Sequence, residues 1–403
     1  MKYVERCQSF LHWGQPDNDF LVYLPIRDMW KKNPDKLLMQ FSIHAMGKLM
    51  PEFRNAILEI DKAGFDCDYI SERLLMQTFC KDGKLVTAGG STYKGLVIPG
   101  SGQMPEAVKQ HIEQLKVQGA PVIYGIDADE MSKAALPEQM KYAIGLKAIR
   151  RKNPTGYHYF MANLTPDDIR QRVKLAVDFK DAKWFNPLNG EITDARFDAD
   201  GIDICLRSGE SMILQTFSDS LCLNEKAELT NDEDRHSDIV LDGHWTLSFT
   251  EEAPKVGKTY QLDKLQAWET LDGLTRTVMG TGVYTTRFKL SKRDDPQGPW
   301  LIDLGDVRES ARVYINGVFI GCAWSVPFVL DTKGKLKVGE NEVRIEVTNL
   351  PANRISELDR QGVQWRKMEE INVVDIHYKK TLYDDWAPMP SGLNSAVRLC
   401  RRN

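Results

Sequence analysis

The chain has 403 residues, of which 42% are hydrophobic and 27% are charged. This composition is typical of a globular protein of two or three domains, because single hydrophobic cores stop growing well before this length, and it excludes a disordered, collagen-like or membrane-spanning chain. The formal net charge is −4, from 53 basic and 57 acidic residues, and no long run of either sign occurs, so nucleic acid is not expected as a partner.

The cysteine pattern and the N-terminus say little about the compartment. The seven cysteines form no CxxC pair and no cluster that could hold a metal ion, which predicts free thiols. They are Cys7, Cys67, Cys80, Cys205, Cys222, Cys322 and Cys400. The first residues carry charges and lack the apolar core of a signal peptide. The localisation stays unknown: the chain is either cytoplasmic or a piece whose targeting segment lies upstream.

Residues 1–135 alternate strand and helix patterns. Short apolar runs predict strands, those buried on both faces being typical of a parallel sheet: 20–25, 67–70, 85–87, 93–99 and 120–124. Residues 51–63 and 105–118 carry apolar side chains at helical spacing. The alternation of the two patterns predicts an α/β domain with an open, largely parallel sheet.

Residues 136–223 lose the helical period and read as short strands separated by turns. Asn153-Pro154-Thr155-Gly156 stands between two strand-like runs and predicts a hairpin. Further strands are expected at 172–179, 182–185, 192–197, 202–206 and 211–217. The pattern predicts an antiparallel β-sandwich.

A polar, highly charged stretch at 224–238 has the composition of a linker. From residue 239 to residue 403 short strands return. Asn316-Gly317, between two apolar runs, is the strongest hairpin signal in the sequence. We therefore predict a third domain at 239–403 with the architecture of a β jelly roll.

The search for catalytic machinery gives little. Gly100-Ser101-Gly102 follows a predicted strand and precedes a helix, where a nucleophile elbow or phosphate loop would lie, but it lacks the rest of either pattern. A flexible turn is the plainer interpretation, and the alternative, an enzyme acting at Ser101, has only His111 nearby in sequence as a base. The acidic stretches 127–130 and 232–234 are read as solvated loops, with calcium binding as the alternative.

Several segments of the third domain occur together in a recognisable order: Gly282-Val-Tyr, the Asn316-Gly317 hairpin, Trp324-Ser-Val-Pro-Phe and Leu336-Lys-Val-Gly-Glu-Asn. This part resembles the sugar-binding, galactose-binding-like jelly roll of family 2 glycoside hydrolases. The continuation, residues 348–355 followed by Trp386-x-x-Met-Pro-Ser-Gly-Leu, resembles the C-terminal region of family 106 glycoside hydrolases, the bacterial α-L-rhamnosidases.

The resemblance extends to the rest of the chain. Residues 5–14 followed by 19–25 resemble the exit helix of a catalytic barrel running into a glutamine-amidotransferase-like, flavodoxin-like α/β domain, and 159–163 with 184–190 resemble the intervening sandwich. In family 106 the (β/α)₈ barrel that carries the catalytic carboxylates and the active-site calcium precedes this region. The resemblance therefore implies that this chain lacks the barrel. We assign no catalytic residue and no certain cofactor, and a structural calcium ion stays open.

A sugar-binding surface needs an aromatic ring to stack on a pyranose, flanked by planar polar groups that bond its hydroxyls. The candidates are Trp268, Trp324, Trp365 and Trp386, with Arg308, Glu309, Asn353 and Arg354 as polar partners. Each also has a structural interpretation: the tryptophans as core or interface, Arg308 and Glu309 as an ion pair, and the Asn353-Arg354 pair as a loop clamp.

These observations lead to two hypotheses. In the first, the chain is the non-catalytic C-terminal portion of a family 106-like glycoside hydrolase, and its ligand is a plant-type polysaccharide or oligosaccharide. Its partner is a catalytic barrel, which a separate polypeptide could carry. In the second, it is a stand-alone carbohydrate-binding or scaffolding protein. Neither implies a nucleic acid or a membrane span, and the family's members are commonly exported.

Overall fold

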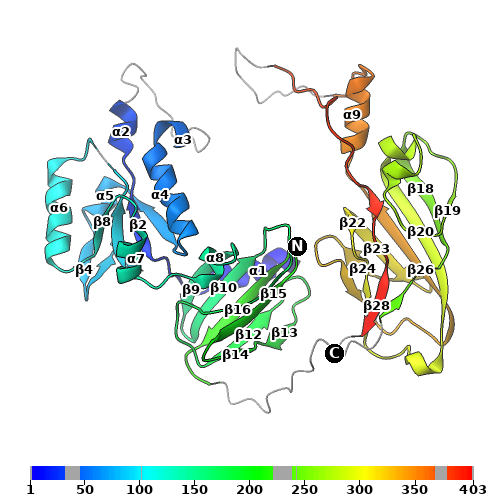
Figure 1. The fold of residues 1–403 in the computed structure, drawn as a ribbon, viewed down its shortest axis with the longest axis horizontal. Coiled ribbons are helices and arrows are strands. Elements are labelled where there is room, and N and C mark those ends of the chain that lie inside the picture. The colour runs from blue at the N-terminus through cyan, green and yellow to red at the C-terminus, as the bar shows by residue number, and fades with distance from the viewer. Residues whose placement is uncertain are drawn as a thin grey trace. The chain divides into compact units, whose positions relative to one another are not determined.

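The computed structural model divides the chain into two compact units, Met1–Ala227 and Glu228–Asn403 (Figure 1). It describes residues 2–31, 46–100, 102–220, 238–241, 243–367 and 379–401. Ser101, Cys222, the acidic stretch 232–234 and most of the predicted linker lie outside the described residues. Antiparallel sheets dominate, so the chain has the β-rich, multidomain fold that the sequence predicts.

Unit 1 begins with a four-stranded parallel sheet in the order β3-β2-β7-β8. Its strands are β2 (Phe20–Tyr23), β3 (Cys67–Ile70), β7 (Gly95–Ile98) and β8 (Val122–Tyr124). Within this sheet, β2 comes first in the chain and lies between β3 and β7, which come second and third. This is the strand order of a doubly wound α/β sheet. The predicted parallel sheet is confirmed.

Helices cover both faces of this sheet, with α4 (Pro51–Lys62) on one side and α6 (Glu106–Val117) on the other (Figure 1). Alternate residues of β2 serve the two layers. Leu21 and Tyr23 pack in the core that contains α6, whereas Phe20 and Val22 pack in the core that contains α4. Because both faces are buried, the strand reads as a continuous apolar run.

The other elements of this part are short. They are α2 (Ile26–Lys31), α3 (Met46–Leu49), α5 (Glu72–Leu75), α7 (Ala128–Ala134), α8 (Gln139–Tyr142), and the strands β4 (Phe79–Lys81), β5 (Lys84–Val86) and β6 (Thr92–Tyr93) of a small antiparallel sheet. The run predicted as one strand at 93–99 is thus divided between β6 and β7.

The second part of unit 1 is antiparallel, with a six-stranded sheet, β1-β9-β10-β16-β12-β13, and a three-stranded sheet, β11-β15-β14. The strands are β1 (Gln15–Pro16), β9 (Lys147–Asn153), β10 (Gly156–Ala162), β11 (Ile169–Val173), β12 (Asp181–Phe185), β13 (Ile192–Asp194), β14 (Phe197–Asp198), β15 (Gly201–Leu206) and β16 (Ser211–Phe217). Both sheets contribute to one core, and β9 pairs with β10 from Asn153 opposite Gly156, as the predicted hairpin requires.

The N-terminal segment packs on this antiparallel part, although the sequence assigned residues 1–135 to the α/β domain. Helix α1 (Lys2–Leu11) is followed by β1, in which Gln15 pairs with Lys152 of β9. Tyr3 Oη lies 2.7 Å from Ser211 Oγ, and Arg6 donates to the carbonyl of Pro187 at 3.0 Å. The resemblance of residues 5–14 to an exit helix predicts a helix here, but it does not show which sheet the helix covers.

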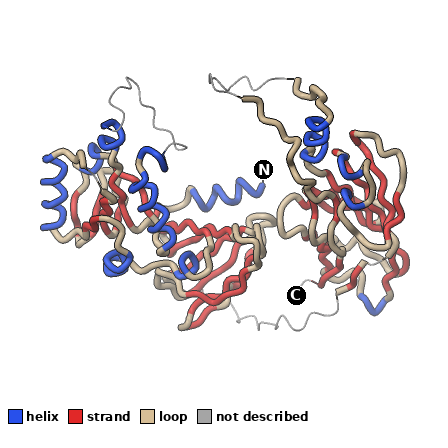
Figure 2. The backbone as a smooth tube through the Cα atoms, turned by 45° about the horizontal axis from the view of Figure 1, so that its top comes forward, coloured by secondary structure: helices blue, strands red, loops and turns tan. Residues whose placement is uncertain are grey.

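Strands are the main regular elements of unit 2, and loops connect them (Figure 2). A six-stranded sheet, β19-β18-β20-β26-β23-β24, and a four-stranded sheet, β17-β28-β21-β25, are antiparallel throughout and share one core. The strands are β17 (Ile239–Val240), β18 (Trp245–Ala253), β19 (Tyr260–Leu262), β20 (Met279–Leu290), β21 (Trp300–Asp303), β23 (Ser310–Ile315), β24 (Val318–Ala323), β25 (Val329–Asp331), β26 (Gly339–Thr348) and β28 (Arg398–Arg401). The architecture agrees with an all-β domain, and its assignment as a jelly roll stays a prediction.

The Asn316-Gly317 turn joins β23 to β24, with Ile315 opposite Val318. Both turn residues have positive φ, 49° and 79°, which is the requirement of a two-residue hairpin turn. In the described part of this unit, the remaining elements are the β22 (Val307–Arg308) and β27 (Gly392–Leu393) pair, the 3₁₀ turns η3 (Trp268–Thr270), η4 (Thr275–Thr277) and η5 (Lys292–Asp294), and helix α9 (Ala352–Arg360).

Among the described residues, no helix is long and apolar enough to cross a membrane. The cysteines of the same part of the chain are all free thiols.

Candidate functional site

Trp268 lies in the core of unit 2, and its prediction as a sugar-stacking ring is wrong. The side chain is fully buried, and its Nε1 donates a hydrogen bond of 2.6 Å to Tyr284 Oη. A Cβ added at Gly282 would lie 2.4 Å from the indole, so the ring is packed against the backbone of β20. No periodic pattern surrounds Trp268, which is why the sequence did not reveal its burial.

Arg308 forms an ion pair with Asp306, whereas the structural interpretation named Glu309 beside it. Its Nε donates to Asp306 Oδ1 at 2.6 Å, and the neighbouring Glu309 has an exposed side chain and donates its backbone N–H to the carbonyl of Thr348. Trp324 follows β24 and is 51% exposed. Arg354 lies on α9 and is half-buried.

Asn353 anchors the C-terminal segment to α9. Its Nδ2 donates to the carbonyl of Met389 and its Oδ1 accepts from the amide of the same residue, both at 2.8 Å. Asn353 is therefore a clamp for the tail, which runs beside α9 on its way to β28 (Figure 1). The clamp positions the residues just before Met389 next to the helix.

Trp386 stands on this tail with its ring partly open to solvent. It is 42% exposed and packs against Tyr383 at a centroid distance of 4.6 Å. Arg360 of α9 donates to the backbone carbonyls of Asp384 and Trp386, each at 2.8 Å. The side chain of Arg360 thus fixes the backbone that carries the indole, while part of the indole surface remains exposed to solvent.

A second tryptophan, Trp365, belongs to the same cluster. The guanidinium of Arg366 lies over the Trp365 ring at 4.6 Å and over the Tyr383 ring at 5.4 Å. Asp359 accepts from Trp365 Nε1 at 2.6 Å and from the amide of Tyr383 at 2.9 Å, and it pairs with Arg366 at 3.9 Å. Burial acts to raise the pKa of Asp359, but these hydrogen bonds and the Arg366 charge outweigh it and lower the pKa.

A small notch opens between η4, α9 and the tail, with a volume of about 10 Å³, enough for roughly one water-sized atom. It is lined by Arg276, Thr277, Asn353, Ser356, Arg360, Trp386 and Pro388. Three segments that are far apart in sequence converge there. Two predicted residues, Asn353 and Trp386, line the notch, whereas Arg276, Ser356 and Arg360 were missed because nothing in the sequence relates η4 to α9.

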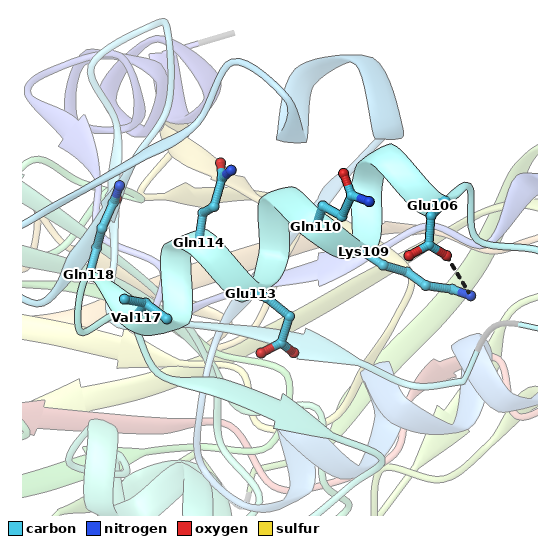
Figure 3. A pocket seen from close by; sticks show the side chains of 7 residues that line it. All are labelled: Glu106, Lys109, Gln110, Glu113, Gln114, Val117 and Gln118. Carbon is cyan, nitrogen blue, oxygen red and sulfur yellow. Dashed lines mark ion pairs between the residues drawn. The ribbon is translucent and has the colours of Figure 1, made fainter.

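Two other features of the described residues, a hollow on α6 and the acidic segment at α7, do not form a candidate site. A wide hollow of about 430 Å³ runs along the outer face of α6 (Figure 3), but all seven lining residues come from this one helix and its end, so no polar groups converge from a second element. Asp127 caps α7, its Oδ1 accepting from the amides of Asp129 and Glu130 at 3.0 and 3.1 Å. The described residues contain no group of three or more side chains suited to hold a metal ion.

Comparison with known proteins points to glycoside hydrolases. The chain is 25% identical over 311 residues to a putative beta-glucuronidase of Formosa agariphila, a match that covers 74% of this chain and 26% of that protein. The structure of a rhamnosidase from Novosphingobium sp. PP1Y matches 99% of this chain and 40% of its own, with a TM-score of 0.66 and 19% identity. A β-glucuronidase from Ruminococcus gnavus matches 45% of this chain and 32% of its own at 19% identity, with a TM-score of only 0.30.

No family model matches the chain. The chain spans about a quarter of the curated relative and two fifths of the rhamnosidase. At 19% identity the rhamnosidase match shows the fold alone. The chain is therefore similar to glycoside hydrolases and shares its fold with one region of a rhamnosidase.

Proposed function

We propose that this chain is the non-catalytic C-terminal portion of a family 106-like glycoside hydrolase, which binds carbohydrate and supports a catalytic barrel. The observation that carries the proposal is the match to a rhamnosidase fold over 99% of the chain but only 40% of the rhamnosidase. In this proposal the parallel sheet of unit 1 is the amidotransferase-like domain, and unit 2 is the galactose-binding-like jelly roll.

Carbohydrate contact is assigned to the cluster on α9 and the tail. Trp386 offers a partly exposed ring, and Arg360 and Asn353 fix the backbone that carries it. A rigid aromatic surface flanked by planar polar groups is suited to a pyranose ring, whose apolar face stacks while its hydroxyls take hydrogen bonds.

Turnover by the purified chain tests the non-catalytic role. With aryl α-L-rhamnoside, β-galactoside and β-glucuronide substrates, we expect no hydrolysis above the buffer rate. Hydrolysis that disappears when one of the chain's own carboxylates is replaced would overturn the proposal.

Calorimetric titration with plant-polysaccharide oligosaccharides tests binding. We expect Trp386→Ala to weaken binding by about tenfold, the order of an aromatic contact of 0.5–1.5 kcal/mol. Trp30→Ala is the matched control, because Trp30 is also exposed, at 52%, and lies in unit 1. Equal loss in both variants, or no loss in either, would exclude the assigned site.

The second candidate is a stand-alone carbohydrate-binding or scaffolding protein. It is favoured by the same exposed ring, since stacking on Trp386 needs no barrel. Expression of the whole gene region distinguishes the two candidate functions. Oligosaccharide binding by this chain with no associated barrel favours the stand-alone protein. Co-purification with a barrel, on the same or another polypeptide, favours the portion of a glycoside hydrolase.

A further inference from the structure

The notch beside Trp386 contains a buried hydroxyl without a partner. Ser356 is 3% exposed, and its Oγ makes no hydrogen bond. A buried hydroxyl that is left unpaired costs free energy, so such groups in folded proteins call for an explanation. Because Ser356 also lines the notch, an atom that enters there lies beside the residue that carries this unpaired hydroxyl.

The charge around the notch is positive. Arg276 and Arg360 both line it, and no carboxylate does. Arg360 uses its three nitrogens on two carbonyls and on Glu357. Arg276 lies on η4 with an exposed side chain, and its guanidinium has no ion-pair or hydrogen-bond partner among the described residues.

An atom that fits this notch is therefore small and negatively charged. A volume of about 10 Å³ admits one oxygen. A hydroxyl donor and a guanidinium with free N–H groups are the partners that a carboxylate oxygen takes, and arginine binds carboxylates with matched geometry. A neutral sugar hydroxyl would satisfy Ser356 but would not form the charge-assisted hydrogen bond that Arg276 offers to a carboxylate.

We propose that this notch receives the carboxylate of a uronic acid residue, whose pyranose ring lies on the adjacent indole of Trp386. This inference rests on the proposed carbohydrate-binding function and narrows its ligand to acidic oligosaccharides. Arg276 and Ser356 bind the carboxylate, and Trp386 stacks on the pyranose ring. Because different side chains make the polar contacts and the stacking contact, a substitution can remove one kind of contact and leave the other.

Titration of the full chain with tetragalacturonate and with its methyl ester tests the proposal, because the two probes share one skeleton and differ only in charge. We expect the acid to bind at least about tenfold more tightly, as for a charge-assisted hydrogen bond. Arg276→Gln should reduce affinity for the acid to that of the ester and leave the ester unchanged. Trp386→Ala should weaken both.

Ser356→Ala gives a second readout. Removing an unpaired hydroxyl should leave the melting temperature unchanged or raised, while affinity for the acid falls by about tenfold. Arg312→Gln is the matched control, because Arg312 is another exposed arginine of unit 2 without an ion pair among the described residues, and it should change neither affinity.

The outcomes separate this inference from the function on which it rests. Equal affinity for acid and ester, with both lost in Trp386→Ala, would overturn the uronic acid assignment and leave carbohydrate binding intact. Tighter binding of a sulfated oligosaccharide than of the uronate would overturn the carboxylate assignment in favour of a sulfate ester. Binding of none of these probes would overturn both proposals.

Discussion

Each unit contains an arginine whose side chain is buried among interaction partners. The clusters around these two arginines differ in whether polar groups beside them remain without hydrogen-bond partners. In unit 1, Arg150 is 1% exposed and bonds Asp17, Asp19 and Glu138 at 2.6, 2.9 and 2.7 Å. In unit 2, Arg366 lies between two aromatic rings and beside Asp359. The second cluster adjoins the notch and the partly exposed ring of Trp386.

The Arg150 cluster is closed. Tyr159 Oη donates to the same Glu138 oxygen at 2.9 Å, and Lys94 pairs with Asp19 at 2.8 Å. These residues come from the segments that precede β2, β7 and α8 and from β9 and β10 of the antiparallel part, so the network joins the two parts of unit 1. Beside the other cluster, the side chains of Ser356 and Arg276 have no partner among the described residues. Unused polar groups, and not buried charge alone, therefore distinguish the proposed binding site from a structural joint.

The largest expected effect follows from opening the closed cluster. Arg150→Met leaves Glu138 buried without its cation and leaves Asp19 paired with Lys94 alone, and removal of one partner from a buried ion network costs about 3–5 kcal/mol. Urea unfolding of the full chain should show this loss in unit 1. Arg172→Gln, which breaks an exposed pairing with Asp198 and Asp203, should cost no more than about 1 kcal/mol. Similar losses of unfolding free energy in the two variants would show that the buried Arg150 network stabilises the fold no more than an exposed ion pair does.

A smaller and local effect is expected in unit 2. Asp359→Ala leaves Trp365 Nε1 and the Tyr383 amide, both half-buried, without this acceptor, at about 0.5–1.5 kcal/mol for each lost hydrogen bond. Hydrogen exchange at the tail, residues 379–389, should accelerate by roughly tenfold or more without global unfolding. Asp385→Ala, an exposed neighbour, is the control. Unchanged exchange would mean that Asn353 alone holds the tail.

Acid should affect unit 1 before unit 2. His158 is buried beneath α1; its Nε2 faces the carbonyl of Phe10 and its Nδ1 faces Asn153 Nδ2, whose amide is oriented by Thr155. The ring must therefore accept at Nδ1 and stay neutral. Burial lowers its pKa, opposed by the Phe10 carbonyl and assisted by the Arg151 charge.

A lowered histidine pKa means that the unfolded chain binds the extra proton first, so stability should fall as the pH drops below about 6.5. Hydrogen exchange at α1 should rise in that range. Asn153→Asp, which offers Nδ1 an acceptor, should reduce the dependence. Because the folded pKa of Asp359 is lowered, its contribution to unit 2 is complete above about pH 4 and is lost only at lower pH. Loosening of the tail before α1 would contradict this order.

The smallest effect is expected at Trp324. Its ring is 51% exposed and does not line the notch, so Trp324→Ala should change the free energy of unfolding by about 0.5 kcal/mol or less and leave uronate binding unchanged. A loss of binding would relocate the carbohydrate site to the edge of the six-stranded sheet, as the sequence left open.

The sequence by itself determined those features whose causes are local. Continuous apolar runs between helical patterns predicted the parallel sheet, and Asn316-Gly317 predicted its hairpin. Each follows from a period or from a turn whose backbone angles only certain residues adopt.

Only the tertiary structure decided how distant segments meet. It buried Trp268, moved α1 onto the antiparallel part of unit 1, and brought Arg276 of η4 to Ser356 of α9. Residues 80 positions apart share no local period, and whether a hydroxyl has a partner depends on every atom packed around it. A site defined by unpaired groups is for that reason visible only after folding.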